Sequence, residues 1–314
     1  PDRVPITFDA EKEVYDKLFN HFSIHTKEQL WDKLRVDTWF VGPQPRIKPK
    51  RIASDITEDI WGVRWRTASY GSGSYTDVIY NPLKGEITLK DIENYPWPPL
   101  EVNDFSNIPS QCEQQKNRAL IGHAGLGLFF RASFVRGMDD LLMDFMLEPE
   151  RAKAILNKIE PFIFYQIKEY MRVAGKLIDI FYLADDFCMQ TAPLIPPHIF
   201  KEFFYPYLKQ VAEIVHENNC KFLFHCCGSV RPLLPILIEA GIDILEPIQT
   251  RAKGMEVEGL KKDFGEKLCF YGSIDLQEVL VKGDKETVKR EVIKNIEILG
   301  KGGGSVSYTH LRAH

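Results

Sequence analysis

Residues 221–228, KFLFHCCG, combine the pattern of a buried strand with three reactive side chains at its end. An apolar run at 222–224 precedes His225, Cys226 and Cys227. Side chains two apart on a strand point the same way, so His225 and Cys227 can reach one point while Cys226 faces the opposite side. Zn²⁺ accepts mixed nitrogen and sulfur ligands, which makes this pair a candidate zinc half-site. The alternative is that these are ordinary buried side chains, because free cysteine is among the most buried residue types.

Around this segment the chain alternates short strands with helical stretches. Strands are expected to begin near residues 3, 38, 119, 178, 221, 242 and 268. Apolar residues recur at helical spacing between them, which indicates parallel βαβ units, and Pro149 and Pro161 are expected to begin helices. Aromatic and β-branched residues on both sides of the GSGS at 71–74 predict a β-hairpin, an N-terminal excursion from the main architecture. The fold class is therefore α/β, a TIM-type (β/α)8 barrel with one strand still to be found.

The place left for the eighth strand is SVSYTHLRAH, residues 305–314, after GKGGG. This tail resembles a translated sequencing adapter. We therefore expect one barrel domain over residues 1–304 and a non-native tail over 305–314, with the last strand truncated or replaced. Residues 305–308 could still mimic a strand.

Composition and charge narrow the possible partners. The chain is 44% hydrophobic and 27% charged, with a formal net charge of −4. These values are ordinary for a globular protein and provide no general attraction to nucleic acid or to an anionic membrane. The six cysteines lack the spacing of a secreted disulfide scaffold, and no apolar stretch approaches the roughly 20 residues of a transmembrane helix. A cytoplasmic location with reduced thiols is expected.

Polar residues follow the expected strands of the C-terminal half. They are Asp185, Asp186, His225, Cys227, Glu246 and Asp275. The carboxyl ends of parallel strands meet at one face, where the ligand site of such folds lies. Asp185, Asp186 and Asp275 are candidate catalytic carboxylates. The alternatives are that one member of the Asp185-Asp186 pair caps the following turn and that Asp275 caps the helix near residue 276.

Four further residues are candidates for binding substrate. Gln190, Gln249 and Gln277 lie just beyond strand ends, and His123 follows an earlier strand. Their amide and imidazole groups could hydrogen-bond a polar ligand. The alternatives are ordinary loop glutamines and a structural histidine.

Several segments resemble the uroporphyrinogen decarboxylase superfamily. They are DRVPI near the start, DIWGVRW and NPL, LADDFCMQTAPLIPPHIFKEFFYPYLK, FHCCGSVRPLLPILIEAGIDILEPIQ, LKKDFGEKLCFYGSIDLQEVL and the closing GGG. Together they cover nearly all of the chain before residue 305. The resemblance implies a (β/α)8 barrel, in a superfamily that includes both the decarboxylase and cobalamin-dependent methyltransferases.

The resemblance also separates two branches. The decarboxylase itself acts without metal, and uses N-terminal arginines and an aspartate near the end of an early strand. Here Val41-Gly42-Pro43 stands where that aspartate is expected, which disfavours decarboxylation of a tetrapyrrole. The methyltransferase branch carries a zinc-binding His-x-Cys pair, completed by a late cysteine, and His225-x-Cys227 matches the pair.

The methyltransferase branch implies a zinc-dependent enzyme that moves a methyl group between a small methylated substrate and a corrinoid protein. Its cofactors would be Zn²⁺ and a corrinoid (cobalamin) carried by the partner protein. The late cysteine would lie where the tail begins, so another residue is needed as third ligand. We expect Glu246 first, ahead of Asp186 and Cys188, with the alternative that Glu246 accepts a hydrogen bond from His225.

Two other functions stay open at this point. The chain could be a metal-free decarboxylase of the same barrel, which zinc retained after purification would exclude. It could also be a truncated, inactive barrel or a corrinoid-protein binding module, because loss of a strand exposes sheet edges.

Overall fold

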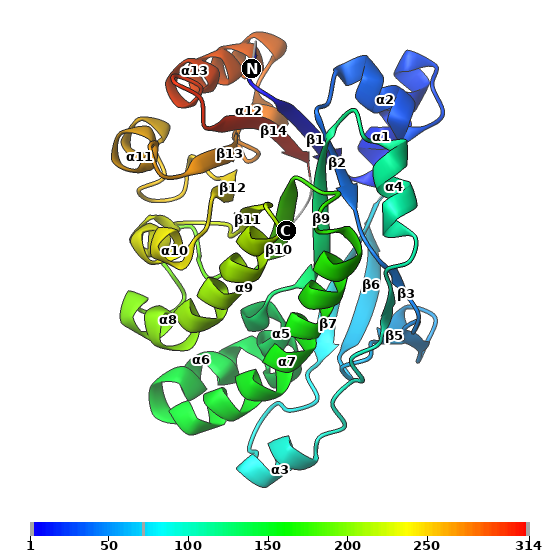
Figure 1. Cartoon of the computed structure of the whole chain (residues 1–314), viewed down its shortest axis with the longest axis vertical. Helices are drawn as coiled ribbons and strands as arrows, with labels where there is room; N and C mark the ends of the chain where they lie inside the picture. Colours follow the sequence, from blue (N-terminus) through cyan, green and yellow to red (C-terminus); the bar gives the residue numbers. More distant parts are fainter. Residues whose placement is uncertain (1–2, 71–72, 312–314) are drawn as a thin grey trace.

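Eight parallel strands form one sheet in the computed structural model, which describes residues 3–70 and 73–311. The strands are β1 (Ile6–Ala10), β2 (Thr38–Val41), β9 (Ala119–Leu126), β10 (Ile180–Ala184), β11 (Lys221–His225), β12 (Ile244–Ile248), β13 (Cys269–Ser273) and β14 (Ser305–Leu311). Their order, β1-β14-β13-β12-β11-β10-β9-β2, curls the sheet almost into a closed barrel (Figure 1). At the seam between β1 and β2, Asp37 N donates to Ile6 O at 2.8 Å, and the Thr7 and Thr38 hydroxyls lie 2.8 Å apart. The expected (β/α)8 barrel is confirmed.

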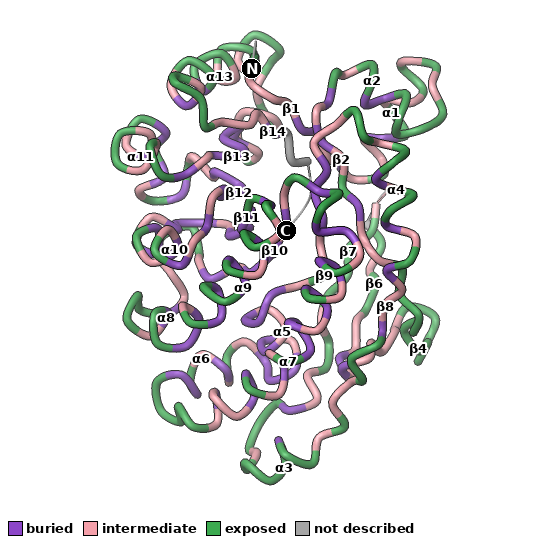
Figure 2. Tube along the Cα trace, in the orientation of Figure 1, coloured by how far each residue is buried: buried purple, intermediate pink, exposed green. Residues whose placement is uncertain are grey.

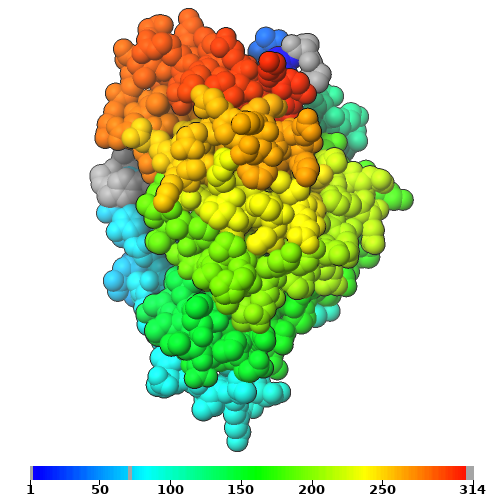
Figure 3. Space-filling view, turned by 90° about the vertical axis from the view of Figure 1, so that its left-hand side faces the viewer, coloured from blue at the N-terminus to red at the C-terminus, as the bar shows by residue number. Residues whose placement is uncertain are grey.

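Helices connect the strands and surround the sheet (Figure 1). They are α1 (Lys12–Phe22), α2 (Lys27–Leu34), α3 (Leu89–Asn94), α4 (Ile108–Gln114), α5 (Leu128–Arg136), α6 (Met138–Leu147), α7 (Pro149–Ala174), α8 (Pro197–Phe203), α9 (Tyr205–Glu217), α10 (Leu234–Ala240), α11 (Val257–Phe264), α12 (Val279–Lys282) and α13 (Lys285–Leu299). In the space-filling view the units that follow β10 are stacked in chain order, from green through yellow to red (Figure 3). Among the described residues, none of the helices has the length and apolar character of a membrane span.

Helix α7 differs from the expectation of two helix starts. It begins at Pro149 but continues through Pro161 as one helix of 26 residues. A proline inside a helix removes one backbone hydrogen bond. Ile159, Phe162 and Ile163, which flank it, are buried in the main core, and this packing outweighs the lost bond.

The N-terminal excursion is a separate antiparallel sheet. Its strands are β4 (Lys50–Arg51), β5 (Ile56–Glu58), β6 (Arg64–Tyr70) and β7 (Gly73–Tyr80), and β6 pairs with β7 as the expected hairpin. A shorter antiparallel pair flanks this sheet in the chain: β3 (Gln44–Pro45) precedes it and β8 (Asn103–Asp104) follows it. Arg131 of α5 joins the excursion to the barrel, because its guanidinium lies 4.9 Å from the Trp61 ring centre and 3.7 Å from Asp59.

The segment expected to lie outside the barrel domain forms its eighth strand. β14 pairs in parallel with β13 on one side and with β1 on the other, with Phe270 opposite Ser305 and Ile6 opposite Ser307. The barrel therefore extends past the expected boundary at residue 304, up to residue 311. That residues 305–314 replace a native strand stays a prediction, and residues 312–314 lie outside the described part.

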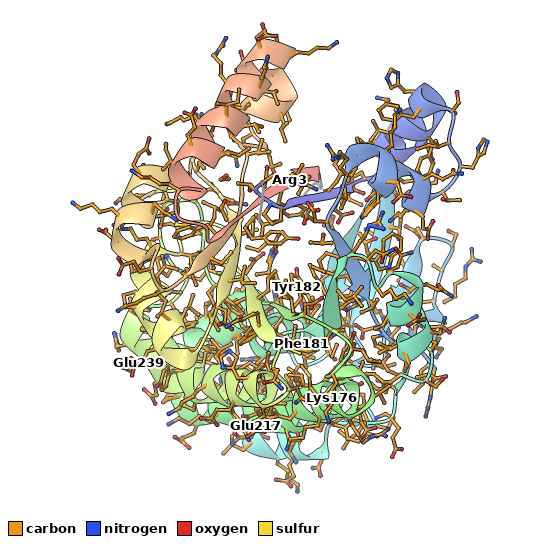
Figure 4. The ribbon with its side chains drawn as sticks, turned by 45° about the horizontal axis from the view of Figure 1, so that its top comes forward. Arg3, Lys176, Phe181, Tyr182, Glu217 and Glu239 are labelled. Atoms are coloured by element: carbon orange, nitrogen blue, oxygen red, sulfur yellow. The ribbon has the colours of Figure 1, made fainter. Side chains whose placement is uncertain are left out.

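Side chains alternate between two cores along each strand. Phe181 faces the helices and Tyr182 faces the barrel interior, as Figure 4 shows for these two neighbours on β10. The interior core is small and contains Ile121, Leu223 and Tyr271, whereas the larger core lies between the sheet and the helices. Burial is accordingly greatest along the strands and the inner faces of the helices (Figure 2).

Candidate metal centre at the carboxyl ends of the strands

His225 and Cys227 meet inside the barrel mouth. β11 ends at His225, and two residues later the Cys227 sulfur lies 3.4 Å from His225 Nε2. Cys226 faces the surrounding helices, where its buried sulfur accepts a hydrogen bond from Phe187 N at 3.4 Å. Gly228 then turns the chain with φ +89°, and a Cβ at this position would lie 2.6 Å from Met189 O. The alternation inferred from residues 221–228 therefore holds in three dimensions.

Asp186, which follows β10, completes a group of three ligand-type side chains. Its Oδ1 lies 3.5 Å from His225 Nε2 and accepts a hydrogen bond from Cys227 N at 2.6 Å. Within the described ranges, Asp186, His225 and Cys227 offer ligand atoms that all lie within 4.8 Å of one another. They bring an oxygen, a nitrogen and a sulfur to one point.

Glu246, which we expected to be the third ligand, lies on the other side of the imidazole. Its Oε2 is 2.5 Å from His225 Nδ1, because β12 places Glu246 directly opposite His225 in the sheet register. It is outside the group of three, so this geometry favours Asp186 as the third ligand. Glu246 then has the alternative role, that of accepting a hydrogen bond from His225. A carboxylate at Nδ1 leaves Nε2 as the nitrogen that faces a metal, the usual arrangement of a metal-bound histidine.

The donor set fits a zinc ion. Tetrahedral ligands about 2.1 to 2.3 Å from zinc lie roughly 3.5 Å from one another. The Nε2–Sγ and Nε2–Oδ1 separations of 3.4 and 3.5 Å match that spacing. Three protein ligands would leave one position of the tetrahedron for substrate, as in catalytic zinc sites.

Burial and charge set the protonation of the group without a metal. Burial lowers the pKa of His225, but the Glu246 carboxylate and the contact with Cys227 outweigh it and raise that pKa well above its ordinary value. Burial raises the pKa of the Cys227 thiol, and His225 opposes this only in part. A bound cation reverses this preference, because it favours the thiolate and the neutral imidazole.

Asp185 is separated from the mouth although it adjoins Asp186. Its carboxylate is fully buried and accepts hydrogen bonds from Phe129 N and Phe130 N, at 2.9 and 2.6 Å, in the first turn of α5. Burial raises its pKa to about 7. Of the two neighbouring aspartates, one therefore caps a helix and the other faces the candidate metal site. A direct catalytic role for Asp185 stays a prediction.

Asp275 caps the start of a helix, which is the alternative given for it in the sequence analysis. Its carboxylate accepts hydrogen bonds from Gln277 N at 2.9 Å and Val279 N at 3.4 Å, and Arg251 lies 3.7 Å away. These partners place it at the start of α12. A direct catalytic role for Asp275 stays a prediction.

A cavity that we call the polar pocket opens beside Asp186 and Cys227. It has a volume of about 440 Å³, and its lining includes Gln190, Gln249, Thr250, Arg251, Ser273, Asp275 and Gln277. Gln190 Nε2 donates to Gln249 Oε1 at 2.7 Å, and Gly228 N donates to the same oxygen at 3.0 Å. The structure therefore gathers the three candidate glutamines in one cavity.

A second cavity, which we call the aromatic pocket, shares Tyr308 with the polar pocket. It also measures about 440 Å³, and its lining includes Phe8, Asp9, Tyr15, Lys27, Trp31, Trp39, Phe40, His123, Tyr182, Glu246, Tyr271 and Tyr308. His123 belongs here and not with the glutamines, and burial lowers its pKa. Tyr308 of β14 lines both cavities. No local sequence pattern indicates this cavity, because its rings come from segments distant in the chain.

The fold and the site together define a class, a (β/α)8-barrel protein with metal-ligand side chains at the carboxyl ends of its strands. The family model described as Uroporphyrinogen decarboxylase (URO-D) matches residues 110–308, well over half of the chain. This protein therefore belongs to the uroporphyrinogen decarboxylase family.

Two known proteins are similar to it. Uroporphyrinogen decarboxylase 2, chloroplastic, from Oryza sativa subsp. japonica is 22% identical over 243 residues, which cover 74% of this chain and 58% of that protein. The chain thus spans less than two thirds of this curated relative. A solved methyltransferase from Methanosarcina mazei matches with a TM-score of 0.68 and 16% identity, covering 100% of this chain and 89% of that one. At this identity the match shows a shared fold.

Proposed function

We propose that this protein is a zinc-dependent methyltransferase that moves a methyl group between a small methylated substrate and a corrinoid protein. The observation that carries the proposal is the convergence of Asp186, His225 and Cys227 at the barrel mouth. The fold shared with a protein described as a methyltransferase supports it. The wide mouth, with two cavities side by side around Tyr308, suits a reaction between two bound partners.

Each residue of the site has a proposed part. Asp186 Oδ1, His225 Nε2 and Cys227 Sγ would hold zinc, which when bound supplies a Lewis acid for the substrate heteroatom. Glu246 fixes the imidazole through Nδ1, so that Nε2 stays directed at Cys227 and Asp186. Gln190, Gln249 and Gln277 would orient a polar substrate in the polar pocket beside Cys227.

Zinc content tests the metal assignment. We expect about one zinc per chain in the parent protein and almost none in the His225→Ala, Cys227→Ala double variant. Cys226→Ala is the matched control, because its sulfur lies in the same stretch but faces the helices, and it should retain zinc. An equal zinc content per chain in the parent and the double variant would contradict the metal assignment.

Methyl transfer tests the activity. The zinc-loaded protein is incubated with cob(I)alamin and methylated donors, or with methylcobalamin and methyl acceptors, while the cobalamin spectrum is recorded. We expect turnover that the double variant lacks. Turnover unchanged in the double variant contradicts a role for these ligands.

The family name favours a second candidate, a metal-free decarboxylase of a tetrapyrrole. The sequence at the end of β2, Val41-Gly42-Pro43, offers no carboxylate for pyrrole nitrogens, so we rank it second. Conversion of uroporphyrinogen by the zinc-free protein would reverse this ranking.

A further inference from the structure

One wall of the aromatic pocket is a pack of rings from four different elements. Phe8 (β1), Tyr15 (α1), Trp31 (α2) and Trp39 (β2) form it. Tyr15 stacks on Trp31 at 5.8 Å and 18°, and Trp39 meets Trp31 at 6.0 Å and 64°. Tyr15 and Trp31 are only 6% and 7% exposed. The rings hold one another, so the wall is preorganised for a ligand.

An alkylammonium group already lies against this wall. Lys27, the exposed first residue of α2, places its Nζ 4.5 Å from the Tyr15 ring centre and 5.8 Å from that of Trp31. Both distances are within the range of a cation–π contact. The wall therefore accepts a cation, and the group that it holds is the end of an exposed side chain.

The charges around the cavity also favour a cation. Asp9 and Glu246 contribute carboxylates, of which Asp9 Oδ1 accepts from the Tyr15 hydroxyl at 2.8 Å and Glu246 is paired with His225. Burial lowers the pKa of His123, so its ring adds no positive charge at neutral pH. Among the lining residues that the structure describes, Lys27 carries the positive charge.

The opposite wall places the cavity next to the candidate metal centre. Tyr182 meets Phe40 edge to face at 5.7 Å, and the Tyr182 ring lies 6.0 Å from that of His225. Figure 4 shows Tyr182 inside the barrel. A volume of about 440 Å³ is enough for a small organic molecule.

We propose that the aromatic pocket binds a methylated ammonium cation, held by the faces of Tyr15 and Trp31 and by the charge of Asp9, in the place that Lys27 Nζ now takes. Binding itself does not depend on zinc.

The test uses choline and its neutral isostere 3,3-dimethyl-1-butanol as probes, in isothermal titrations of the full chain. We expect choline to bind about 10-fold more tightly, because the two differ in charge and hardly in shape. Equal affinity overturns the proposal. Retention of choline binding by the His225→Ala, Cys227→Ala variant is also expected, so failure of the metal site and failure of the cation site are separate results.

Lys27 provides the sharper variant. Lys27→Ala removes the competing ammonium from an exposed position and should tighten choline binding several-fold. Lys33→Ala is the matched control, since Lys33 lies on the same helix with its Nζ 5.6 Å from the Phe22 ring, away from the cavity. Lys33→Ala should change nothing. Weaker or unchanged choline binding in Lys27→Ala overturns the proposal.

Discussion

Aspartates lie at both ends of the barrel, and their contacts differ between the two ends. At the amino ends, one aspartate directly precedes each of β2, β10 and β12 and accepts a hydrogen bond from a backbone N–H of the neighbouring strand. The pairs are Asp37 with Ile6 N at 2.7 Å, Asp179 with Leu120 N at 2.8 Å and Asp243 with Phe222 N at 2.8 Å. At the carboxyl ends, Asp186 accepts a hydrogen bond from Cys227 N and also lies beside the side chains of His225 and Cys227.

The difference shows where this fold keeps its reactive groups. At the amino ends the carboxylates are occupied by the backbone of the barrel itself, so they contribute to stability. At the carboxyl ends the strands run into loops, and side chains from β10, β11 and β12 face one another. These aspartates precede alternate strands of the barrel, and β14 would be the next in this series. Gly304 stands before β14 and has no carboxylate.

The largest effect should come from Asp186→Ala. The variant loses a proposed ligand, so we expect zinc affinity to fall by more than about 100-fold, beyond the loss typical of an outer-shell partner. Competition with a chelator measures it. Asp243→Ala at the other end of the barrel is the control and should keep the affinity of the parent. If both variants bind zinc alike, the two ends do not differ in this way.

Glu246→Gln should have the next largest effect. The amide cannot carry the charge that stabilises the His225 Nδ1–H contact, so zinc affinity should fall by about 10- to 100-fold while the ligand atoms remain. The same chelator competition applies. A loss as complete as that of the His225→Ala, Cys227→Ala variant would instead make Glu246 a ligand.

Asp243→Ala should lower the free energy of unfolding by about 1–3 kcal/mol, because it leaves the Phe222 N–H, on a buried residue, without its acceptor. Urea unfolding measures the change. The control is Glu239→Ala, which removes an exposed ion pair with Lys201 at 2.9 Å and should cost less than Asp243→Ala. Equal costs would mean that the amino-end carboxylate is an ordinary surface charge.

The smallest effect is the pH dependence of the difference in unfolding free energy between the parent and Asp243→Ala. Burial acts to raise the pKa of Asp243, but the Phe222 N–H, His216 and Lys221 outweigh it and hold the pKa below its ordinary value. A carboxyl with a lowered pKa stabilises the fold above the unfolded pKa of about 3.9, and this contribution is lost as the pH falls through the folded value. The gap between the parent and Asp243→Ala should therefore shrink below about pH 4, as the Asp243 carboxyl takes up a proton. A gap that widens below about pH 4 contradicts the sign.

Much of the barrel could be predicted from local patterns. Helical and strand periodicities are set by neighbouring residues, so seven strands and the hairpin excursion were expected close to where they lie. The side of the strand on which Cys226 lies follows from the same alternation. Pro161 was misplaced as a helix start, because long-range packing against the core overrides a local signal.

By itself, the sequence determined the order of strands and helices and the His225-x-Cys227 pair, since both depend on spacing along one segment. Tertiary structure alone decided that Asp186 and not Glu246 joins that pair. The strand register brings Glu246 to Nδ1 and the end of β10 brings Asp186 to Nε2, and no spacing along the chain encodes which edge of a ring a neighbour will meet. The aromatic pocket has the same origin, because closing the sheet places Tyr15 and Trp31 in one cavity with Tyr308.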